Sequence, residues 1–446
     1  MKLIHKATII NEGTSFTGSV LLEGERISRV FTGDVPAEVM NACRQVIDAR
    51  GLYLIPGVID DQVHFRDPGL THKGDLFTES RAAVAGGVTS FMEMPNTNPQ
   101  TVTLEALDRK MESAAEKSAA NFSFYLGATN DNLKELKKAD SKKICGVKVF
   151  MGASTGNMLV DNESALQGIF AEVDALIATH CEKEEIIREN IDLYRKKYGE
   201  EIPISAHPLI RSAEACYRSS AQAIELADKY GARLHVLHLS TAREMALFSA
   251  APLETKKITA EVCVHHLWFS DQDYERLGAR IKWNPAVKTA EDRQALREAL
   301  TQGKLDVVAT DHAPHLLSEK QGGALRAASG GPLVQHSLQV MLALAGKGVF
   351  SREQVVEKMC HAPARLFRVK DRGFIREGYF ADLVLVDPAK PYTVTPQNIL
   401  YKCGWSPFEE ETFSCTVTKT FVNGQLVWDG ENVADNIQGM PLAFER

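Results

Sequence analysis

Short apolar runs rich in β-branched and aromatic residues recur along the middle of the chain, and most are followed by a stretch in which apolar residues return every three or four positions. The runs are typical of buried strands, and the stretches are typical of helices with one apolar face. The predicted strands cover residues 54–60, 88–94, 122–128, 146–151, 175–180, 233–239, 258–264 and 306–311. An eightfold alternation of strand and helix favours an α/β fold of the (β/α)8 (TIM) barrel type over an open doubly wound sheet.

Two of the intervening helices have clear signals. Residues 210–230 keep a helical period, and a second helix is predicted to begin at Thr289, because a threonine cap is followed by acidic residues in the first turn.

The two ends of the chain show a different pattern. Residues 1–53 and 368–446 alternate apolar and polar positions and contain hairpin signals such as Asn423-Gly424. Neither segment alone can form a stable hydrophobic core. We therefore predict that they pair as one small domain of the β-sandwich type beside a barrel formed by residues 54–367. The chain termini would then lie close together.

Composition narrows the class of protein. The chain has 446 residues and a formal net charge of −7, which argues against a surface built to coat nucleic acid or anionic lipid. No apolar run approaches the roughly 18 residues that a membrane span needs, and the first residues lack the pattern of a secretory signal. We therefore expect a cytoplasmic protein, with its eight cysteines as reduced, mostly buried thiols.

Residues of types that can bind metals lie in, at the end of, or just after five of the predicted strands. Alone, a histidine at a strand end is usually structural, and Asp311 could cap a turn. Together they fit a divalent cation, because the carboxyl ends of barrel strands meet at one mouth, and imidazoles with an oxygen donor suit zinc. The predicted metal ligands are His64, Lys148, His180, His238 and Asp311.

Lys148 lies between Val147 and Val149 in a predicted barrel strand, so alternation turns it into the barrel. Burial disfavours an ammonium, and a neutral amine can react with carbon dioxide to give a carbamate, which can bridge two metals. The alternative is a lysine that reaches out to solvent at the barrel rim.

Several motifs in order along the chain resemble the cyclic amidohydrolases, and the dihydroorotases most. The segments that carry the resemblance are 57–69 (GVIDDQVHFRDPG), 94–99 (MPNTNP), 148–152 (KVFMG), 238–241 (HLST), Asn284-Pro285, 310–315 (TDHAPH) and 377–387 (EGYFADLVLVD). The resemblance thus covers nearly the whole chain.

This resemblance implies a metal-dependent hydrolase that interconverts L-dihydroorotate and N-carbamoyl-L-aspartate in pyrimidine biosynthesis. It implies one or two zinc ions on the five ligands, carboxylated Lys148 as their bridge, and a metal-bound hydroxide whose proton passes through Asp311 as general base and acid. It also implies an anionic pyrimidine substrate held by Arg66, Asn96, Asn284 and His315, and a homodimer as one possible assembly.

Gln62 departs from the family pattern, because a histidine is usual two residues before His64. An amide oxygen binds zinc more weakly than imidazole does, so we expect one metal position to be weakened. Two alternatives therefore stay open: a non-catalytic homologue that serves as an assembly subunit, and a hydantoinase- or allantoinase-like hydrolase of a related ring.

Residues 316–331 form a glycine-rich segment directly after the proposed catalytic aspartate. It could fold over bound substrate, or it could be an ordinary connection. We assign His265, His266 and His312 structural or supporting roles, since their spacing demands no metal.

Overall fold

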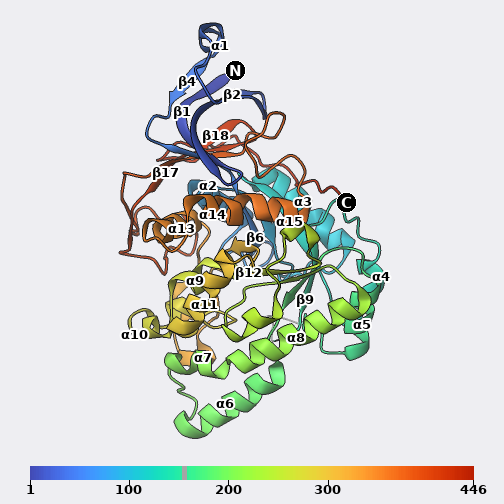
Figure 1. Ribbon diagram of the computed structural model, residues 1–446. Coiled ribbons are helices and arrows are strands. Elements are labelled where there is room, and N and C mark those ends of the chain that lie inside the picture. The colour runs from blue at the N-terminus through green and yellow to red at the C-terminus, as the bar shows by residue number, and fades with distance from the viewer. Residues whose placement is uncertain (153–157) are drawn as a thin grey trace.

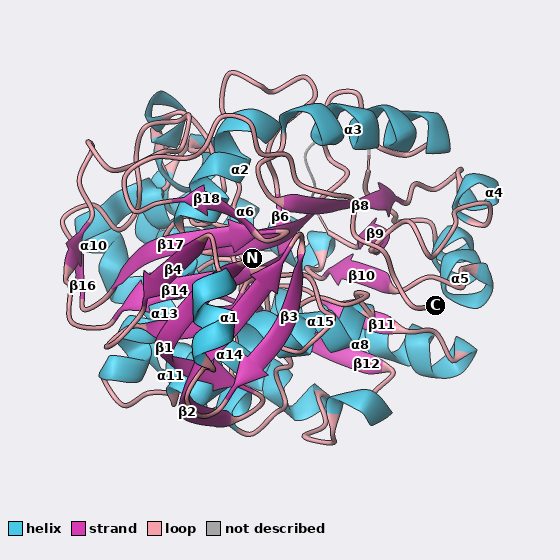
Figure 2. Cartoon of the chain, turned by 90° about the horizontal axis from the view of Figure 1, so that it is seen from above, coloured by secondary structure: helices cyan, strands magenta, loops and turns pink. Residues whose placement is uncertain are grey.

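The computed structural model describes residues 1–152 and 158–446 (Figure 1). A barrel of parallel strands with helices around it lies below a separate mixed sheet, which confirms the predicted fold class. Figure 2 looks down on the mixed sheet and shows most helices near the outside of the molecule.

The barrel sheet has eight strands in the order β13-β12-β11-β10-β9-β8-β7-β6. Each predicted strand overlaps one of them, so the apolar runs identified the barrel. The strands are β6 (Val58–Val63), β7 (Val88–Glu93), β8 (Asn121–Gly127), β9 (Gly146–Phe150), β10 (Ile177–His180), β11 (Leu234–Val236), β12 (Ile258–Cys263) and β13 (Val307–Ala309).

The barrel closes between its first and last strands through one backbone bridge and through the side chain of Asp60. Val63 and His312 form an isolated parallel bridge, and the His64 N–H donates to the His312 carbonyl at 2.7 Å. The buried Asp60 carboxylate accepts from the Thr310 hydroxyl at 2.6 Å and from the Thr310 N–H at 3.2 Å. We call this junction of β6 and β13 the seam.

The predicted first barrel strand, 54–60, is in fact two strands. Strand β5 (Tyr53–Pro56) pairs with β1 and β14 of the mixed sheet, and β6 begins at Val58. Gly57 lies between them against β7, where a Cβ atom would come 2.0 Å from Thr89 Oγ1. Only glycine fits this approach, so the chain passes from one sheet to the other there.

The helices follow the strands as predicted. They are α1 (Ala37–Ala42), α2 (Leu76–Ala85), α3 (Leu104–Lys117), α4 (Leu133–Leu136), α5 (Glu163–Glu172), α6 (Glu184–Tyr198), α7 (His207–Ile210), α8 (Ala213–Tyr230), α9 (Val264–Trp268), α10 (Tyr274–Leu277), α11 (Ala290–Thr301), α12 (Gly323–Arg326), α13 (Ser337–Gly346), α14 (Arg352–Val356) and α15 (Ala362–Phe367). Helix α11 has the predicted cap, since Thr289 Oγ1 accepts from the Asp292 N–H at 3.1 Å. Helix α8 begins slightly later than predicted, after its cap at Ser212.

Both ends of the chain contribute to the mixed sheet, as predicted. Its strands are β1 (Lys2–Asn11), β2 (Thr14–Glu23), β3 (Arg26–Phe31), β4 (Gln45–Asp48), β5, β14 (Leu383–Asp387), β17 (Thr416–Val422) and β18 (Gln425–Trp428). The two halves meet where β14 runs antiparallel to β5. A two-stranded ribbon, β15 (Tyr392–Thr393) with β16 (Thr412–Phe413), lies apart from this sheet.

The expectation that the termini lie together is wrong, because the last residues leave the mixed sheet and pack on the barrel (Figure 1). Leu442 and Phe444 are buried in an apolar cluster with barrel residues such as Tyr125. Arg446 donates to the Cys145 carbonyl at 2.7 Å, beside the amino end of β9. The segment therefore covers the end of the barrel opposite the carboxyl ends of the strands.

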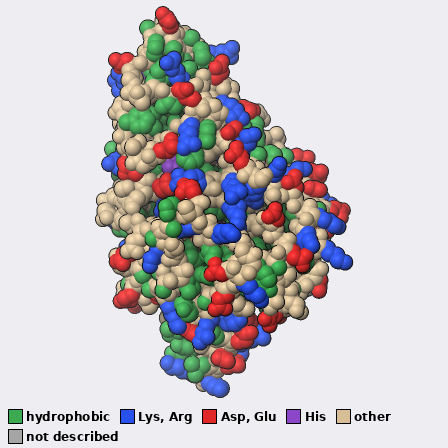
Figure 3. Space-filling view, turned by 45° about the vertical axis from the view of Figure 1, so that its right-hand side comes forward, with side chains coloured by type: hydrophobic (Ala, Val, Ile, Leu, Met, Phe, Trp, Pro, Cys, Tyr) green, Lys and Arg blue, Asp and Glu red, His purple; other side chains and the backbone are tan. Residues whose placement is uncertain are grey.

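All eight cysteines are free and six of them are buried. Among the described residues, no helix has both the length and the apolar character needed to cross a membrane. Acidic and basic side chains both occur across the face drawn in Figure 3, with a small group of basic ones near its middle.

Candidate active site

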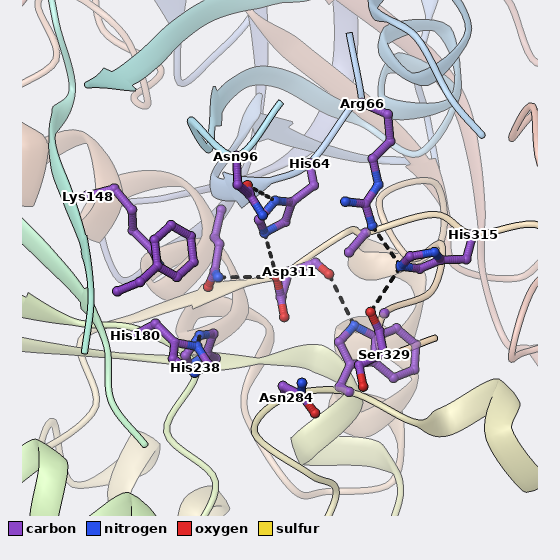
Figure 4. Close-up of a pocket in the computed structure, with 15 residues that line it drawn as sticks. His64, Arg66, Asn96, Lys148, His180, His238, Asn284, Asp311, His315 and Ser329 are labelled. Carbon is purple, nitrogen blue, oxygen red and sulfur yellow. Dashed lines mark hydrogen bonds and ion pairs between the residues drawn. The ribbon is translucent and has the colours of Figure 1, made fainter. Parts of the chain in front are cut away.

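A pocket opens at the carboxyl ends of the barrel strands, and every predicted site residue contributes to its wall (Figure 4). Its lining is Gln62, His64, Arg66, Asn96, Lys148, Phe150, His180, His238, Trp283, Asn284, Asp311, Ala313, His315, Ser329 and Gly330. Side chains more than 240 residues apart in sequence, such as Arg66 and His315, are thus in contact.

Three of these residues have backbone conformations that residues other than glycine rarely adopt. The φ angle is 70° at Arg66, 41° at His238 and 49° at Asp311. Positive φ at a non-glycine residue is costly and is concentrated at functional sites, where the surrounding fold maintains it. Each of these turns directs a side chain into the pocket.

His180 and His238 face each other from neighbouring strand ends, with His180 Nδ1 3.0 Å from His238 Nε2. Burial is the main cause that lowers the pKa of both imidazoles, and that of His238 lies well below its usual value. Both rings are therefore neutral near pH 7, the form in which imidazole binds a metal.

Glu182 and Arg211 orient His180. Glu182 Oε2 lies 3.1 Å from His180 Nε2, and the same carboxylate is bound by the Arg211 guanidinium. Burial opposes the charge on Glu182, but Arg211 and His180 lower its pKa to about 2. The carboxylate holds Nε2 and leaves Nδ1 toward the pocket, as partners of metal-binding histidines commonly do. Sequence reasoning missed Glu182, whose only local signal is an acid two positions after a histidine.

Lys148 is buried inside the barrel, with Nζ 4.7 Å from the centroid of the Phe150 ring. Burial lowers the pKa of Lys148 to about 8, although Asp311 and Glu261 oppose the shift. No carboxylate forms an ion pair with it within residues 1–152 and 158–446. The neutral amine that carbamylation requires is therefore more populated at Lys148 than at an exposed lysine.

Asp311 lies at the centre of the pocket, and two side chains contact its Oδ1. His64 Nε2 is 3.1 Å from Asp311 Oδ1, and Gln62 Nε2 donates to the same oxygen at 3.2 Å. His64 Nδ1 is in turn 2.8 Å from Asn96 Oδ1, so Asn96 helps to orient the imidazole. Gln62 thus occupies the wall beside Asp311 with a hydrogen-bonding amide.

The opposite end of the pocket is cationic (Figure 4). Arg66 Nε donates to the Pro314 carbonyl at 3.0 Å, while Arg66 Nη2 lies 3.1 Å from His315 Nε2. Lys73 Nζ is 3.1 Å from His315 Nδ1. Burial lowers the pKa of Arg66 to about 10, which leaves it charged at neutral pH, and burial followed by these cations holds the pKa of His315 far below its usual value. This end is suited to an anionic group.

Asn284 lies between the two ends (Figure 4), and its Oδ1 has no hydrogen-bond partner among the described residues. A buried amide oxygen without a partner is costly, so a ligand that donates a hydrogen bond there would be favoured.

The residues at the metal end fit a divalent cation. The facing His180 and His238 nitrogens are neutral, their separation of 3.0 Å is close to that of two ligands of one ion, and each is fixed by its surroundings. The Glu261 side chain, for example, accepts from the His238 N–H at 2.8 Å. The wall with His64 and Asp311 supplies fewer strong metal ligands, because Gln62 contributes only an amide.

Two further clusters of buried polar side chains lie close to the pocket. Asp61, His235 and Glu261 meet inside the barrel, with His235 Nε2 3.1 Å from Asp61 Oδ2. Cys263 lies near His265 and His266, and His265 stacks on Trp283 with ring centroids 4.4 Å apart.

His312 is satisfied by the chain around it. Its Nε2 is 2.8 Å from Glu79 Oε2, and its Nδ1 accepts from the Leu333 N–H at 2.9 Å. These contacts are those of a supporting histidine.

Comparisons with known proteins agree with this geometry. The sequence profile of the Amidohydrolase family matches residues 53–427. The chain is 34% identical over 419 residues to a dihydroorotase of Halobacterium salinarum, covering 93% of this chain and 94% of that protein. It is 34% identical over 403 residues to a dihydroorotase of Methanosarcina mazei, covering 87% and 86% of the two chains.

Solved structures give the same fold. The L-hydantoinase (dihydropyrimidinase) of Arthrobacter aurescens superposes with a TM-score of 0.91 at 28% identity and 97% coverage of both chains. The dihydropyrimidinase of Brevibacillus agri superposes with a TM-score of 0.89 at 24% identity, covering 100% of this chain and 99% of that one.

Proposed function

The chain belongs to the amidohydrolase family, in the group of cyclic amide hydrolases that includes dihydroorotases and hydantoinases, and we propose that it is a dihydroorotase. The reaction is the reversible opening of L-dihydroorotate by water to N-carbamoyl-L-aspartate, a step of pyrimidine biosynthesis. The observation that carries this proposal is the division of the pocket into a cationic end at Arg66 and His315 and a metal-type end at Lys148, His180 and His238.

The cationic end selects the substrate. L-Dihydroorotate carries a carboxylate on its ring, and the Arg66 guanidinium can bind it through two parallel hydrogen bonds. His315 and Asn96 would complete the carboxylate site, while Asn284 Oδ1 would accept from a ring N–H. A neutral cyclic amide would gain nothing from Arg66.

The metal end would hold zinc or a similar divalent ion. Carbamylated Lys148, His180 and His238 would form one position, and His64, Asp311 and the same carbamate would form the other, weakened by Gln62. Such ions, when bound, polarise a carbonyl and make water acidic enough to attack near neutral pH.

Asp311 would move the proton. As the C–O bond forms at the ring carbonyl, its carboxylate accepts the proton of the attacking water, and it returns that proton to the ring nitrogen when the C–N bond breaks. His64 and Gln62, both in contact with Asp311 Oδ1, hold the carboxylate in the pocket. The reverse sequence closes the ring.

The deciding experiment incubates metal-analysed protein with L-dihydroorotate, hydantoin and allantoin and follows ring opening of each. We expect between one and two divalent ions per chain and turnover of L-dihydroorotate above the other two. Faster turnover of a neutral hydantoin would favour the second candidate function, hydantoinase-like hydrolysis. The fold similarity to the Arthrobacter L-hydantoinase is the observation that supports this alternative. Inactivity after metal and bicarbonate have been supplied would favour a non-catalytic assembly subunit.

A further inference from the structure

The glycine-rich segment 316–331 has no part in the mechanism above. It leaves the pocket after His315, forms a short helical turn (Leu317–Lys320) and α12, and returns to the pocket wall at Ser329 and Gly330. Its course therefore begins and ends at the cationic end of the pocket.

Lys320 holds the returning part of this segment. Its Nζ donates to the carbonyls of Lys282 at 3.2 Å, Ala328 at 2.6 Å and Gly330 at 2.5 Å. Three acceptors match the three N–H donors of an ammonium. The side chain is buried, and within the described residues no carboxylate forms an ion pair with it. Burial lowers the pKa of Lys320 well below its usual value, and the hydrogen bonds to this turn are what offset the cost of burying the side chain.

Lys282 connects the turn to the neighbouring wall. Its own Nζ donates to the Ala327 carbonyl, and its carbonyl accepts from the Gly330 N–H at 2.8 Å. Gly331, the next residue, packs tightly on the wall, since a Cβ atom there would come 2.6 Å from the Trp283 ring. The turn 328–331 is therefore a fixed part of the pocket wall.

The Ser329 carbonyl, between two of the carbonyls that Lys320 binds, contacts His315 Nε2 at 3.0 Å. On the other side of the ring, Lys73 Nζ lies 3.1 Å from Nδ1 and can only donate. Arg66 Nη2, which also can only donate, lies 3.1 Å from Nε2. A neutral imidazole carries one N–H, so these contacts fix the position of the ring without selecting one tautomer. The Ser329 carbonyl and Lys73 together hold the ring beside Arg66.

We propose that Lys320 is a positioning residue for substrate selection: it fixes the Ala328–Gly330 turn, and the Ser329 carbonyl of that turn holds the His315 ring beside Arg66. The inference rests on the proposed function only for the role of His315 as a carboxylate contact. It also makes segment 316–331 a fixed wall of the pocket rather than a lid.

Lys320→Met tests this, with Lys358→Met as its control. Lys358 Nζ also donates to a backbone carbonyl, that of Leu305 at 2.8 Å, but before β13 and thus at the far end of the barrel. For Lys320→Met we expect a KM for L-dihydroorotate raised roughly tenfold, the size of one lost hydrogen bond from a charged donor, with kcat little changed. Turnover of neutral hydantoin should stay the same in both variants.

Two readouts do not depend on activity. Hydrogen exchange of residues 316–331 should become faster in Lys320→Met and stay unchanged in Lys358→Met. In ¹⁵N spectra of the histidine rings, with the His315 signals assigned by their loss in His315→Gln, those signals should shift in Lys320→Met, because the ring loses its fixed position, and stay unchanged in Lys358→Met. If Lys320→Met does not fold, Lys320→Gln keeps two donors and should give smaller changes in the same direction.

The outcomes separate this inference from the proposed function. If the protein does not open L-dihydroorotate, the proposed function is wrong. The exchange and ¹⁵N measurements still test the role of Lys320 in that case. Unchanged ¹⁵N signals of His315 and unchanged exchange in Lys320→Met would overturn the inference, as would equal losses on L-dihydroorotate and hydantoin.

Discussion

The side-chain amide of Gln62 donates a hydrogen bond to Oδ1 of Asp311 across 3.2 Å. The same oxygen lies 3.1 Å from His64 Nε2. An amide at this point keeps the carboxylate in place without supplying the strong nitrogen donor that a histidine would offer a metal. The two metal positions should therefore differ in affinity.

Replacing Gln62 with histidine should strengthen the weaker position. We expect Gln62→His to raise the metal content toward two ions per chain after dialysis against trace zinc, as measured by elemental analysis. Gln302→His, which adds a histidine at an exposed position after α11, should leave the content unchanged. Equal stoichiometry in Gln62→His and wild type would mean that position 62 does not face a metal.

Arg66→Met should separate charged from neutral substrates. Loss of a buried guanidinium from a carboxylate contact costs about 2–5 kcal/mol, so kcat/KM for L-dihydroorotate should fall by a factor on the order of 100. Turnover of hydantoin should be spared, and exposed Arg109→Met should affect neither substrate. Equal losses on both substrates would make Arg66 a structural residue.

The pH dependence of carbamylation follows from the environment of Lys148. Burial lowers its pKa to about 8, so the reactive amine increases as pH rises. At a fixed concentration of dissolved ¹³CO2, the rate constant for carbamate formation on metal-free protein should rise roughly fivefold between pH 7 and pH 8. Lys148→Arg should show no carbamate signal in the ¹³C spectrum, and a rate that is flat with pH would contradict the assignment.

Asp61→Asn should destabilise the fold most at lower pH. Burial opposes the charge on His235, but the Asp61 and Glu261 carboxylates raise its pKa to about 9. Because this value is above that of the unfolded state, about 6.5, the ion pair contributes fully below pH 6.5 and is lost as pH rises through about 9.

The size of that contribution is about 3 kcal/mol. The difference in urea midpoint between wild type and Asp61→Asn should thus be largest at pH 6.5 and much smaller at pH 9.5. Exposed Asp34→Asn serves as the control. A difference that does not change with pH would show that His235 is neutral in the folded protein.

Local patterns were sufficient to predict the barrel strands and the cap at Thr289, because each depends on neighbouring residues. The convergence of the carboxyl ends of parallel strands predicted that His64, Lys148, His180, His238 and Asp311 would meet, and they line one pocket. The placing of Arg66, Asn96, Asn284 and His315 beside them came from the family resemblance. The break at Gly57 could not be predicted, because the glycine is required by Thr89 on another strand. The same is true of Glu182, Lys73 and Lys320, whose roles depend on contacts made only in the folded chain.

Because the seam joins the first and last strands of the barrel, the pocket is completed late in synthesis of the chain. His64 extends from β6 and Asp311 follows β13, so both lie beside the junction that Asp60 and Thr310 close. A nascent chain whose β13 is still inside the ribosome would have seven strands and only part of the pocket. The complete set of pocket residues would then come together only when the barrel closes. Incomplete chains would be unable to act on a substrate.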